Sequence, residues 1–266
     1  MKFDPFVRIK SLAQAMRRYF IRSVFRCGET FIVSPKNSLI VIPHPDDEVF
    51  GCAQLIAMKR KLGARVTLLM LTDGEAAHRG CCSTSTVIIG SVRRKLAEQS
   101  AILLGLKKDD LIWMAMPDGD IPAIGSNEFV KAVASITDII LELQPGEIYA
   151  PVPFDSWPDH KKAFDLVDPI LNNVQQRTIA VYYYAVWMWW NLRIRDFALA
   201  RTWKRYRLDA DSVKKNKEQA IDIYMSANNP ECGKPYCGDL PKSFVKQFKM
   251  NSEVYFVPPH NIEPIL

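Results

Sequence analysis

Short runs of apolar residues alternate along this chain with longer segments in which apolar residues recur every three or four positions. The short runs predict buried strands, and the longer segments predict helices that pack one face on a core. The expected strands are 38–42, 64–71, 110–114, 147–151, 178–187 and 253–257, and the expected helices are 48–62, 91–104, 127–143, 160–171 and 212–226. Because strands and helices alternate, we expect one α/β domain of Rossmann-like type, with a mostly parallel sheet flanked by helices.

The N-terminal residues 1–30 form a separate basic segment in this pattern, and residues 31–266 form the α/β domain. Residues 1–26 combine arginine and lysine with apolar residues at helical spacing, which predicts an amphipathic helix. Such a helix either lies in the interface of an anionic membrane or packs on its own domain. Both alternatives stay open at this point.

The overall composition is that of an ordinary globular protein. The chain has 266 residues, of which 48% are hydrophobic and 24% charged, so it can bury one large core. The net charge of +6 is compatible with an anionic ligand or surface. No apolar run is long enough to span a bilayer, and residues 1–26 lack the apolar core of a secretory signal. We therefore predict a cytoplasmic protein, either free or in peripheral contact with the inner face of the membrane.

Six cysteines are scattered over the chain without Cys-x-x-Cys spacing: Cys27, Cys52, Cys81, Cys82, Cys232 and Cys237. This pattern indicates reduced thiols rather than a disulfide framework. Cys232 and Cys237 could form a small metal-binding clip, but we expect them to be loop residues. His78, in the expected loop 76–90, could add a metal contact, although a solvated loop histidine is the commoner case.

A cluster of polar residues follows the first expected strand directly: His44, Asp46, Asp47 and Glu48. The junction between a strand's carboxyl end and a helix is where open α/β sheets bind ligands. Neighbouring carboxylates repel one another unless a cation is present, and imidazole with carboxylate is a ligand set that suits zinc. A helix cap would need only one of these residues. The sequence therefore predicts a metal site, with Zn²⁺ as the first candidate and another divalent ion as the alternative.

Acidic residues and a second histidine also follow the later strands. Asp73 follows the second strand, Asp118 follows the third, and Asp155, Asp159 and His160 follow the fourth. Because the carboxyl ends of parallel strands share one edge of the sheet, His44 and His160 can meet there. Asp73 could orient a ligand or only hold its own turn.

The segment His44-Pro45-Asp46-Asp47-Glu48 resembles the signature of the PIG-L / LmbE-like family of zinc-dependent N-acetylglucosaminyl deacetylases. Weaker similarity extends over about 39–255. The resemblance implies that the zinc ligands are His44, Asp47 and His160, that Asp46 is the general base, and that the residues beside the sugar include Asp73, Arg93 and Asp118. We expect the orientation of the ligands to be fixed by Glu48, Asp155 and Asp159.

Trp157 departs from the family pattern, in which many members carry a histidine. An indole donates a hydrogen bond but cannot carry a proton, so carbonyl polarisation would depend more on the metal. Its flat ring could instead contact a sugar. A sugar- or lipid-binding protein of the same fold that has lost its chemistry is therefore an alternative. A hydrolase of a different amide is another, because a zinc site does not specify the acyl group.

Aromatic residues gather at 182–190, and basic residues follow at 193–207. The aromatic residues could fill the core as alternate positions of an edge strand, or form a lip that contacts a sugar or an acyl chain. The arginines could bind phosphate or face solvent. The resemblance implies deacetylation of an N-acetylglucosamine-type sugar, and we expect a small-molecule or lipid-linked amino sugar as the partner. We do not expect nucleic acid, because the carboxylate-rich edge of the sheet would repel it.

Overall fold

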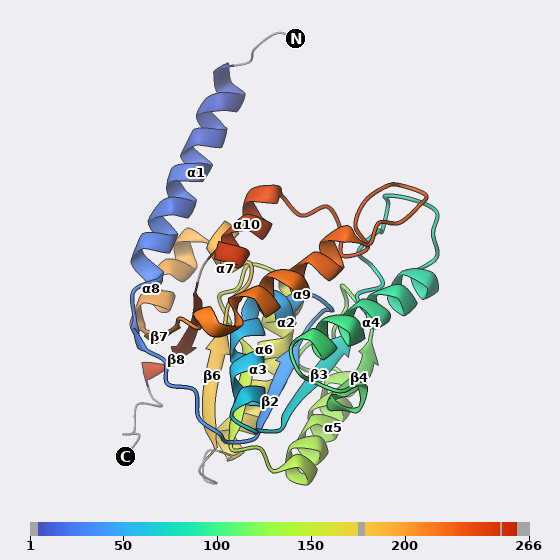
Figure 1. The fold of residues 1–266 in the computed structure, drawn as a ribbon, viewed down its shortest axis with the longest axis vertical. Helices are drawn as coiled ribbons and strands as arrows, with labels where there is room; N and C mark the ends of the chain where they lie inside the picture. Colours follow the sequence, from blue (N-terminus) through green and yellow to red (C-terminus); the bar gives the residue numbers. More distant parts are fainter. Residues whose placement is uncertain (1–4, 175–178, 251, 260–266) are drawn as a thin grey trace.

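The computed structural model describes residues 5–174, 179–250 and 252–259. Its strands form one eight-stranded sheet in the order β1-β7-β8-β6-β5-β2-β3-β4 (Figure 1). The strands are β1 (Glu29–Thr30), β2 (Ser38–Ile42), β3 (Val66–Thr72), β4 (Leu111–Met116), β5 (Glu147–Pro151), β6 (Ala180–Tyr184), β7 (Lys204–Leu208) and β8 (Glu253–Val257). All neighbours are parallel except β6–β8 and β7–β8. The predicted α/β fold with a mostly parallel sheet is confirmed.

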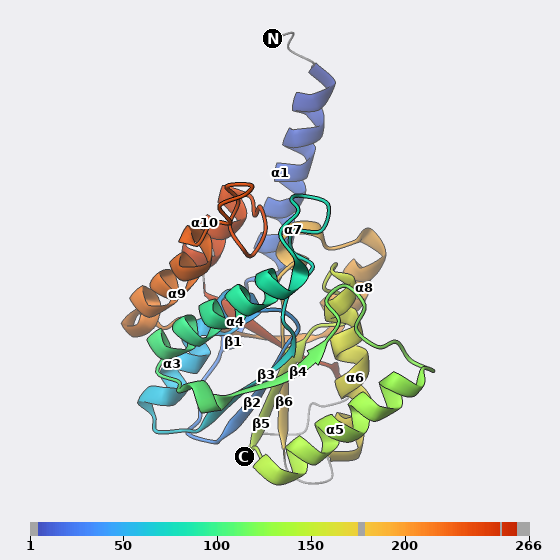
Figure 2. The ribbon, with the colours of Figure 1, turned by 90° about the vertical axis from the view of Figure 1, so that its right-hand side faces the viewer.

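The helices cover both faces of this sheet. They are α1 (Pro5–Phe25), α2 (Asp47–Gly51), α3 (Ala53–Lys61), α4 (Thr86–Leu103), α5 (Asn127–Leu143), α6 (Pro158–Val174), α7 (Met188–Asn191), α8 (Ile194–Thr202), α9 (Lys214–Ser226) and α10 (Lys242–Met250), with short 3₁₀ turns at Lys108–Asp110 and Asp211–Val213. Figure 2 shows α3, α4 and α9 on one side of the sheet and α5 and α6 on the other. Every residue of β2, β3 and β5 is accordingly buried.

Four predicted elements, β2, α5, β5 and β8, begin and end where the sequence placed them. The predicted helix 48–62 is instead two helices that break at Cys52. The reason is a long-range cap: the carboxylate of Glu253 accepts hydrogen bonds from the backbone N–H groups of Gln54 (2.8 Å) and Leu55 (3.0 Å), at the start of α3. No local sequence signal reveals such a cap.

Other boundaries moved for local reasons. Helix α4 begins five residues before the predicted start, because Ser85 caps it through a hydrogen bond from the backbone N–H of Ile88. Strand β6 is shorter than the predicted 178–187, of which residue 178 lies outside the described residues. The alternative of an edge strand was wrong, since β8 pairs with the outer side of β6. Elements β1, β7, α7, α8 and α10 were not predicted; β7 reads Lys-Arg-Tyr-Arg-Leu, a charged stretch at the margin of the sheet.

Helix α1 projects away from the body of the protein, as both views show (Figures 1 and 2). Its C-terminal end is anchored, because Phe25 is buried and Phe20 stacks on Phe197 with ring centroids 5.7 Å apart. Further along the helix, Leu12 and Met16 are 63% and 64% exposed. This part of its apolar face therefore does not pack on the domain. Among the described helices, none is long and apolar enough to cross a membrane.

Candidate active site

The loops that follow β2, β3, β4 and β5 surround a pocket of about 410 Å³ at the carboxyl edge of the sheet. Its polar lining includes His44, Asp46, Asp47, Arg93 and Asp118, and its aromatic lining includes Trp157, Trp187 and Phe244. The strands position the polar residues, because these residues lie in the turns that directly follow the strands and so meet at one edge of the sheet. The size is that of a site for a small molecule.

Three of the predicted ligands surround one point beside this pocket. The Nδ1 atom of His44 lies 3.2 Å from Oδ2 of Asp47, and the same oxygen lies 3.1 Å from Nε2 of His160. The three candidate ligand atoms all lie within 4.8 Å of one another. His160 comes from the first turn of α6, so a helix more than one hundred residues away completes the group.

The remaining nitrogen of each histidine faces other carboxylates. Nδ1 of His160 lies 2.8 Å from Oδ2 of Asp155, and Nε2 of His44 lies 3.2 Å from Asp159 and 3.3 Å from Asp118. A carboxylate accepts the N–H of the imidazole and so leaves the opposite nitrogen with its lone pair. The histidines are thereby oriented as metal ligands, with the lone pairs of His44 Nδ1 and His160 Nε2 turned toward Asp47.

The charges of the three candidate ligands also favour a bound cation. Burial lowers the pKa of His160, but the carboxylates of Asp47 and Asp155 outweigh burial and raise it to about 9. Burial raises the pKa of Asp47, yet the two histidines hold it below its usual range. A neighbouring positive charge therefore stabilises these carboxylates, and an imidazolium or a bound divalent ion can supply it.

One buried atom gives further support for a metal site. Nε2 of His160 makes no hydrogen bond of good geometry with any residue that the structure describes, although Asp47 is near. An orphaned nitrogen that faces a carboxylate and a second imidazole is suited to Zn²⁺ or a similar divalent ion. A second group, His44 with Asp118 and Asp159, is equally compact. The first group differs from it in offering two imidazole nitrogens, one of them the orphaned Nε2 of His160, and so fits Zn²⁺ better.

Asp46 lies next to the three ligands but in an unusual backbone conformation. Its φ of 118° is positive, which is uncommon for a residue other than glycine and costs about 1–3 kcal/mol. Its carboxylate lines the pocket and lies 3.1 Å from the guanidinium of Arg93. Burial raises the pKa of Asp46 well above its usual range, although Arg93 opposes the shift. The strained turn thus presents a carboxyl group that holds a proton more tightly than an exposed aspartate does.

Two fully enclosed side chains hold this turn in place. Glu48 accepts hydrogen bonds from the backbone N–H of Asp46 (2.9 Å), from Ser100 Oγ and from Tyr224 Oη (both 2.6 Å). Arg93 donates to the carbonyl oxygens of Pro45 and Gly74 as well as to Asp46. Sequence reasoning missed Ser100 and Tyr224, because nothing local marks a hydroxyl that reaches across from another helix.

Asp73 and Trp157 take different positions relative to the pocket. Asp73 is not among the described lining residues, and its carboxylate pairs with Arg94 at 2.7 Å. Trp157 is at the rim, 44% exposed, and stacks on Trp187 with centroids 5.0 Å apart and an interplanar angle of 21°. The structure thus shows a flat aromatic surface beside the ligands, formed by Trp157 and by Trp187 of the segment predicted as an aromatic lip.

Most of the aromatic segment 182–190 does not form a lip. Its three tyrosines, Tyr182, Tyr183 and Tyr184, are buried in the core of the sheet, and of its aromatic residues only Trp187 lines the pocket. None of the described arginines from 193 to 207 lines the pocket, and Arg193 and Arg207 pair with nearby aspartates. The expected solvated histidine was also wrong, because His78 is buried.

Comparison with known proteins places this geometry in a family. Among curated proteins none matches the sequence significantly. Several solved structures share the fold. One is N,N'-diacetylchitobiose deacetylase from Pyrococcus horikoshii, with 19% identity, a TM-score of 0.61 and an alignment that covers 99% of this chain and 98% of that chain. Others are the conserved protein TT1542 from Thermus thermophilus, with 20% identity, a TM-score of 0.62 and coverage of 87% of this chain and 96% of that chain, and the 4-carboxy-2-hydroxymuconate hydratase GalB from Pseudomonas putida, with 16% identity, a TM-score of 0.61 and coverage of 86% and 100%.

These structures show the fold but not the reaction, since one is named a deacetylase and another a hydratase. The sequence itself is more specific. Residues 39–171, half of the chain, match the profile of the family described as GlcNAc-PI de-N-acetylase, and this range includes both histidines and all the carboxylates of the site. The chain therefore belongs to the PIG-L family.

Proposed function

We propose that the protein is a metal-dependent hydrolase that removes the N-acetyl group from an N-acetylglucosamine-type sugar carried by a glycolipid or glycoconjugate intermediate. The observation that carries the proposal is the convergence of His44 Nδ1, Asp47 Oδ2 and His160 Nε2 on one point beside the Asp46 carboxyl. The ion is Zn²⁺ or another divalent cation. The family supports deacetylation as the reaction class.

The roles of the residues follow from their positions. A divalent ion bound at this point would polarise the amide carbonyl and acidify water. Asp46 takes a proton from the attacking water as the C–O bond forms, and returns it to the sugar nitrogen as the C–N bond breaks. Arg93 is a positioning residue, because its guanidinium fixes the Asp46 carboxyl through the contact at 3.1 Å. Asp118 and Trp157 line the side of the pocket where a sugar ring would lie.

The position of Trp157 is also compatible with a second function, the binding of a sugar without hydrolysis. An exposed indole stacked on Trp187 is a surface on which a sugar ring packs well, with or without chemistry. A sugar- or lipid-binding protein of this family that has lost activity would have the same surface. A hydrolase of a different amide would share the metal group and differ only in what fills the pocket.

Acetate release separates these functions. Full-length protein loaded with Zn²⁺ is incubated with free, nucleotide-linked and lipid-linked N-acetylglucosamine, and acetate and free amine are measured together. We expect equal amounts of both products from at least one substrate, and their loss after chelation. A metal-loaded protein that binds such a sugar and releases neither product would contradict the hydrolase and support the binding protein.

We further propose that the substrate is lipid-linked and that the enzyme works at the cytoplasmic face of a membrane. The support is the projecting helix α1, whose exposed Leu12 and Met16 accompany basic residues on the same helix. An apolar face without a partner on the domain is free to enter an anionic lipid interface.

The double variant Leu12→Asp, Met16→Asp should bind anionic vesicles more weakly than the native chain by a factor of at least about 100, because each apolar side chain contributes about 1.5–3 kcal/mol on burial. Sedimentation with vesicles at low and high salt measures this, and turnover of a soluble N-acetylglucosamine analogue should not change. The control is Ile32→Asp, an 85% exposed position outside α1. If the native protein does not bind anionic vesicles even at low salt, a soluble substrate becomes the better proposal.

A further inference from the structure

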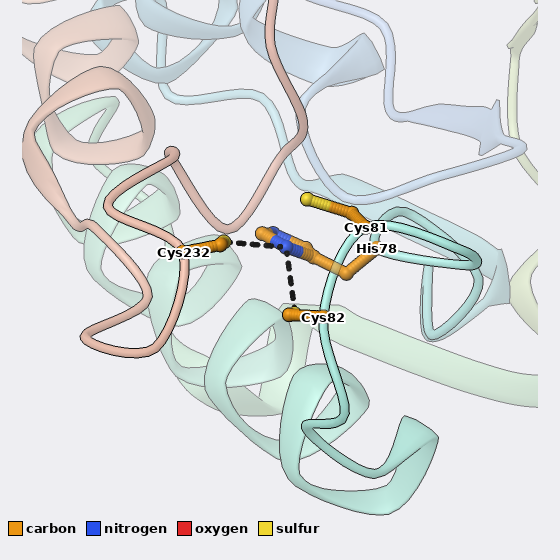
Figure 3. A group of neighbouring side chains, drawn as sticks. All are labelled: His78, Cys81, Cys82 and Cys232. Carbon is orange, nitrogen blue, oxygen red and sulfur yellow. Dashed lines mark hydrogen bonds between the residues drawn. The ribbon is translucent and has the colours of Figure 1, made fainter.

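A third group of potential metal ligands lies at the other side of the pocket wall, and none of its members belongs to the site described above. Figure 3 shows His78, Cys81 and Cys82, from the loop between β3 and α4, facing Cys232, from the loop between α9 and α10. Their four candidate ligand atoms lie within 4.8 Å of one another. Two loops separated by about 150 residues in sequence thus bring one imidazole and three thiols together.

The distances match those of tetrahedral zinc. Nδ1 of His78 lies 3.4 Å from Sγ of Cys232 and 3.7 Å from Sγ of Cys82. With Zn–S distances of about 2.3 Å and Zn–N distances of about 2.0–2.1 Å, a tetrahedron places nitrogen and sulfur about 3.5 Å apart. The side chains are therefore already at the separation that a shared ion requires.

The tautomer of His78 is fixed for metal binding. Its Nε2 atom lies 3.0 Å from the carbonyl oxygen of Pro235, and a carbonyl can only accept, so Nε2 carries the proton. The lone pair is then on Nδ1, the atom that faces the sulfurs. Asn229 supports the same group by donating its side-chain N–H to Sγ of Cys82 at 3.5 Å. His78 is only 4% exposed, which a solvated loop histidine would not be.

We propose that His78, Cys81, Cys82 and Cys232 bind a structural Zn²⁺ ion. Four protein ligands leave no open position, which is the arrangement of structural zinc rather than catalytic zinc. Thiolates select zinc against magnesium and calcium. The proposal does not rest on the hydrolase activity, because it concerns different residues and a different role.

The ion would fasten the two loops that make one wall of the pocket. Ala76, Ala77 and Arg79 from the first loop and Cys237 and Gly238 from the second line the pocket together. A network of hydrogen bonds already joins the loops near the cluster, in which Glu231 accepts from Ser83 and Thr84 and Asn229 donates to Cys82 and Thr84. A metal cross-link beside it would hold the wall closed in a way that exposed hydrogen bonds cannot.

The test uses full-length protein with the His44→Ala, His160→Ala background, in which the other ion cannot bind. Purified under reducing conditions without chelator, this protein should retain about one zinc ion per chain. Adding Cys82→Ser and Cys232→Ser should remove that ion and lower the melting temperature, whereas Cys27→Ser, an exposed cysteine outside the group, should change neither.

Cobalt keeps the test independent of how well the variants fold. Titration of metal-free, reduced native protein with Co²⁺ should produce thiolate-to-cobalt charge-transfer absorption, because only cysteine ligands give it. Absence of that absorption in folded protein overturns the proposal. So does a disulfide between Cys82 and Cys232 in protein purified without an added oxidant, found by mass spectrometry of unreduced peptides.

Discussion

Asp46→Asn should lower deacetylation by about two to four orders of magnitude while the bound metal stays in place, because the change removes a proton acceptor and not a ligand. The carboxylate of Asp46 lies outside the group formed by His44, Asp47 and His160, yet it lines the same pocket. Asparagine has nearly the same size and tolerates a positive φ, so the turn at 118° should survive. Loss of activity can then be read as loss of the base.

The measurement is kcat for acetate release together with metal content and the melting temperature. Asp120→Asn is the matched control, because it makes the same chemical change at a residue in the loop after β4 whose side chain is 87% exposed. An Asp46→Asn enzyme with normal turnover would assign the base to another residue. An Asp46→Asn protein that has lost its metal would show instead that Asp46 is a ligand.

His160→Ala should remove the catalytic ion and with it all measurable activity. His160 supplies the one orphaned nitrogen of the group, and Asp47 loses one of its two imidazole partners when His160 is absent. Asp155→Asn should have a smaller effect of the same kind, about 10–100-fold in metal affinity, because Asp155 orients His160 through the contact at 2.8 Å.

Metal affinity from competition with a chromogenic chelator measures both variants. Asp165→Asn is the control on the same helix, since Asp165 pairs only with Lys161 at the surface among the contacts described. If His160→Ala protein keeps full occupancy with Cys82→Ser and Cys232→Ser present, the ion lies elsewhere. The cysteine changes belong in this experiment so that the second proposed ion does not mask the loss of the first.

The strand-end residues of the site were predictable because their signal is local. Apolar runs mark β2 and β5, and His44 and His160 follow these strands within a few residues, so topology alone brings them to one edge. What supports them was not predictable. Glu48 depends on Tyr224, and α3 depends on Glu253, across nearly the full length of the chain.

The cysteine cluster shows a different limit of sequence reasoning. A search for Cys-x-x-Cys finds nothing, because the ligands read His-x-x-Cys-Cys in one loop and a single cysteine in another. The alternative that Cys232 and Cys237 form a metal-binding clip was wrong. The Sγ atom of Cys237 donates to the carbonyl oxygen of Tyr224, and burial raises the pKa of the Cys237 thiol to about 12. Only the packing of two loops selects His78 as the residue that Cys232 meets.

The central position of β8 has a consequence for how the protein is made. Residues 253–257 lie between β6 and β7, and Glu253 also pairs with the buried Lys217 while it caps α3. Until this strand has left the ribosome, the edges of β6 and β7 that face it have no pairing partner. The motif at 44–48 is synthesised well before Tyr224, which supports Glu48, and before β8, so the open edges of β6 and β7 are prone to aggregation until β8 emerges.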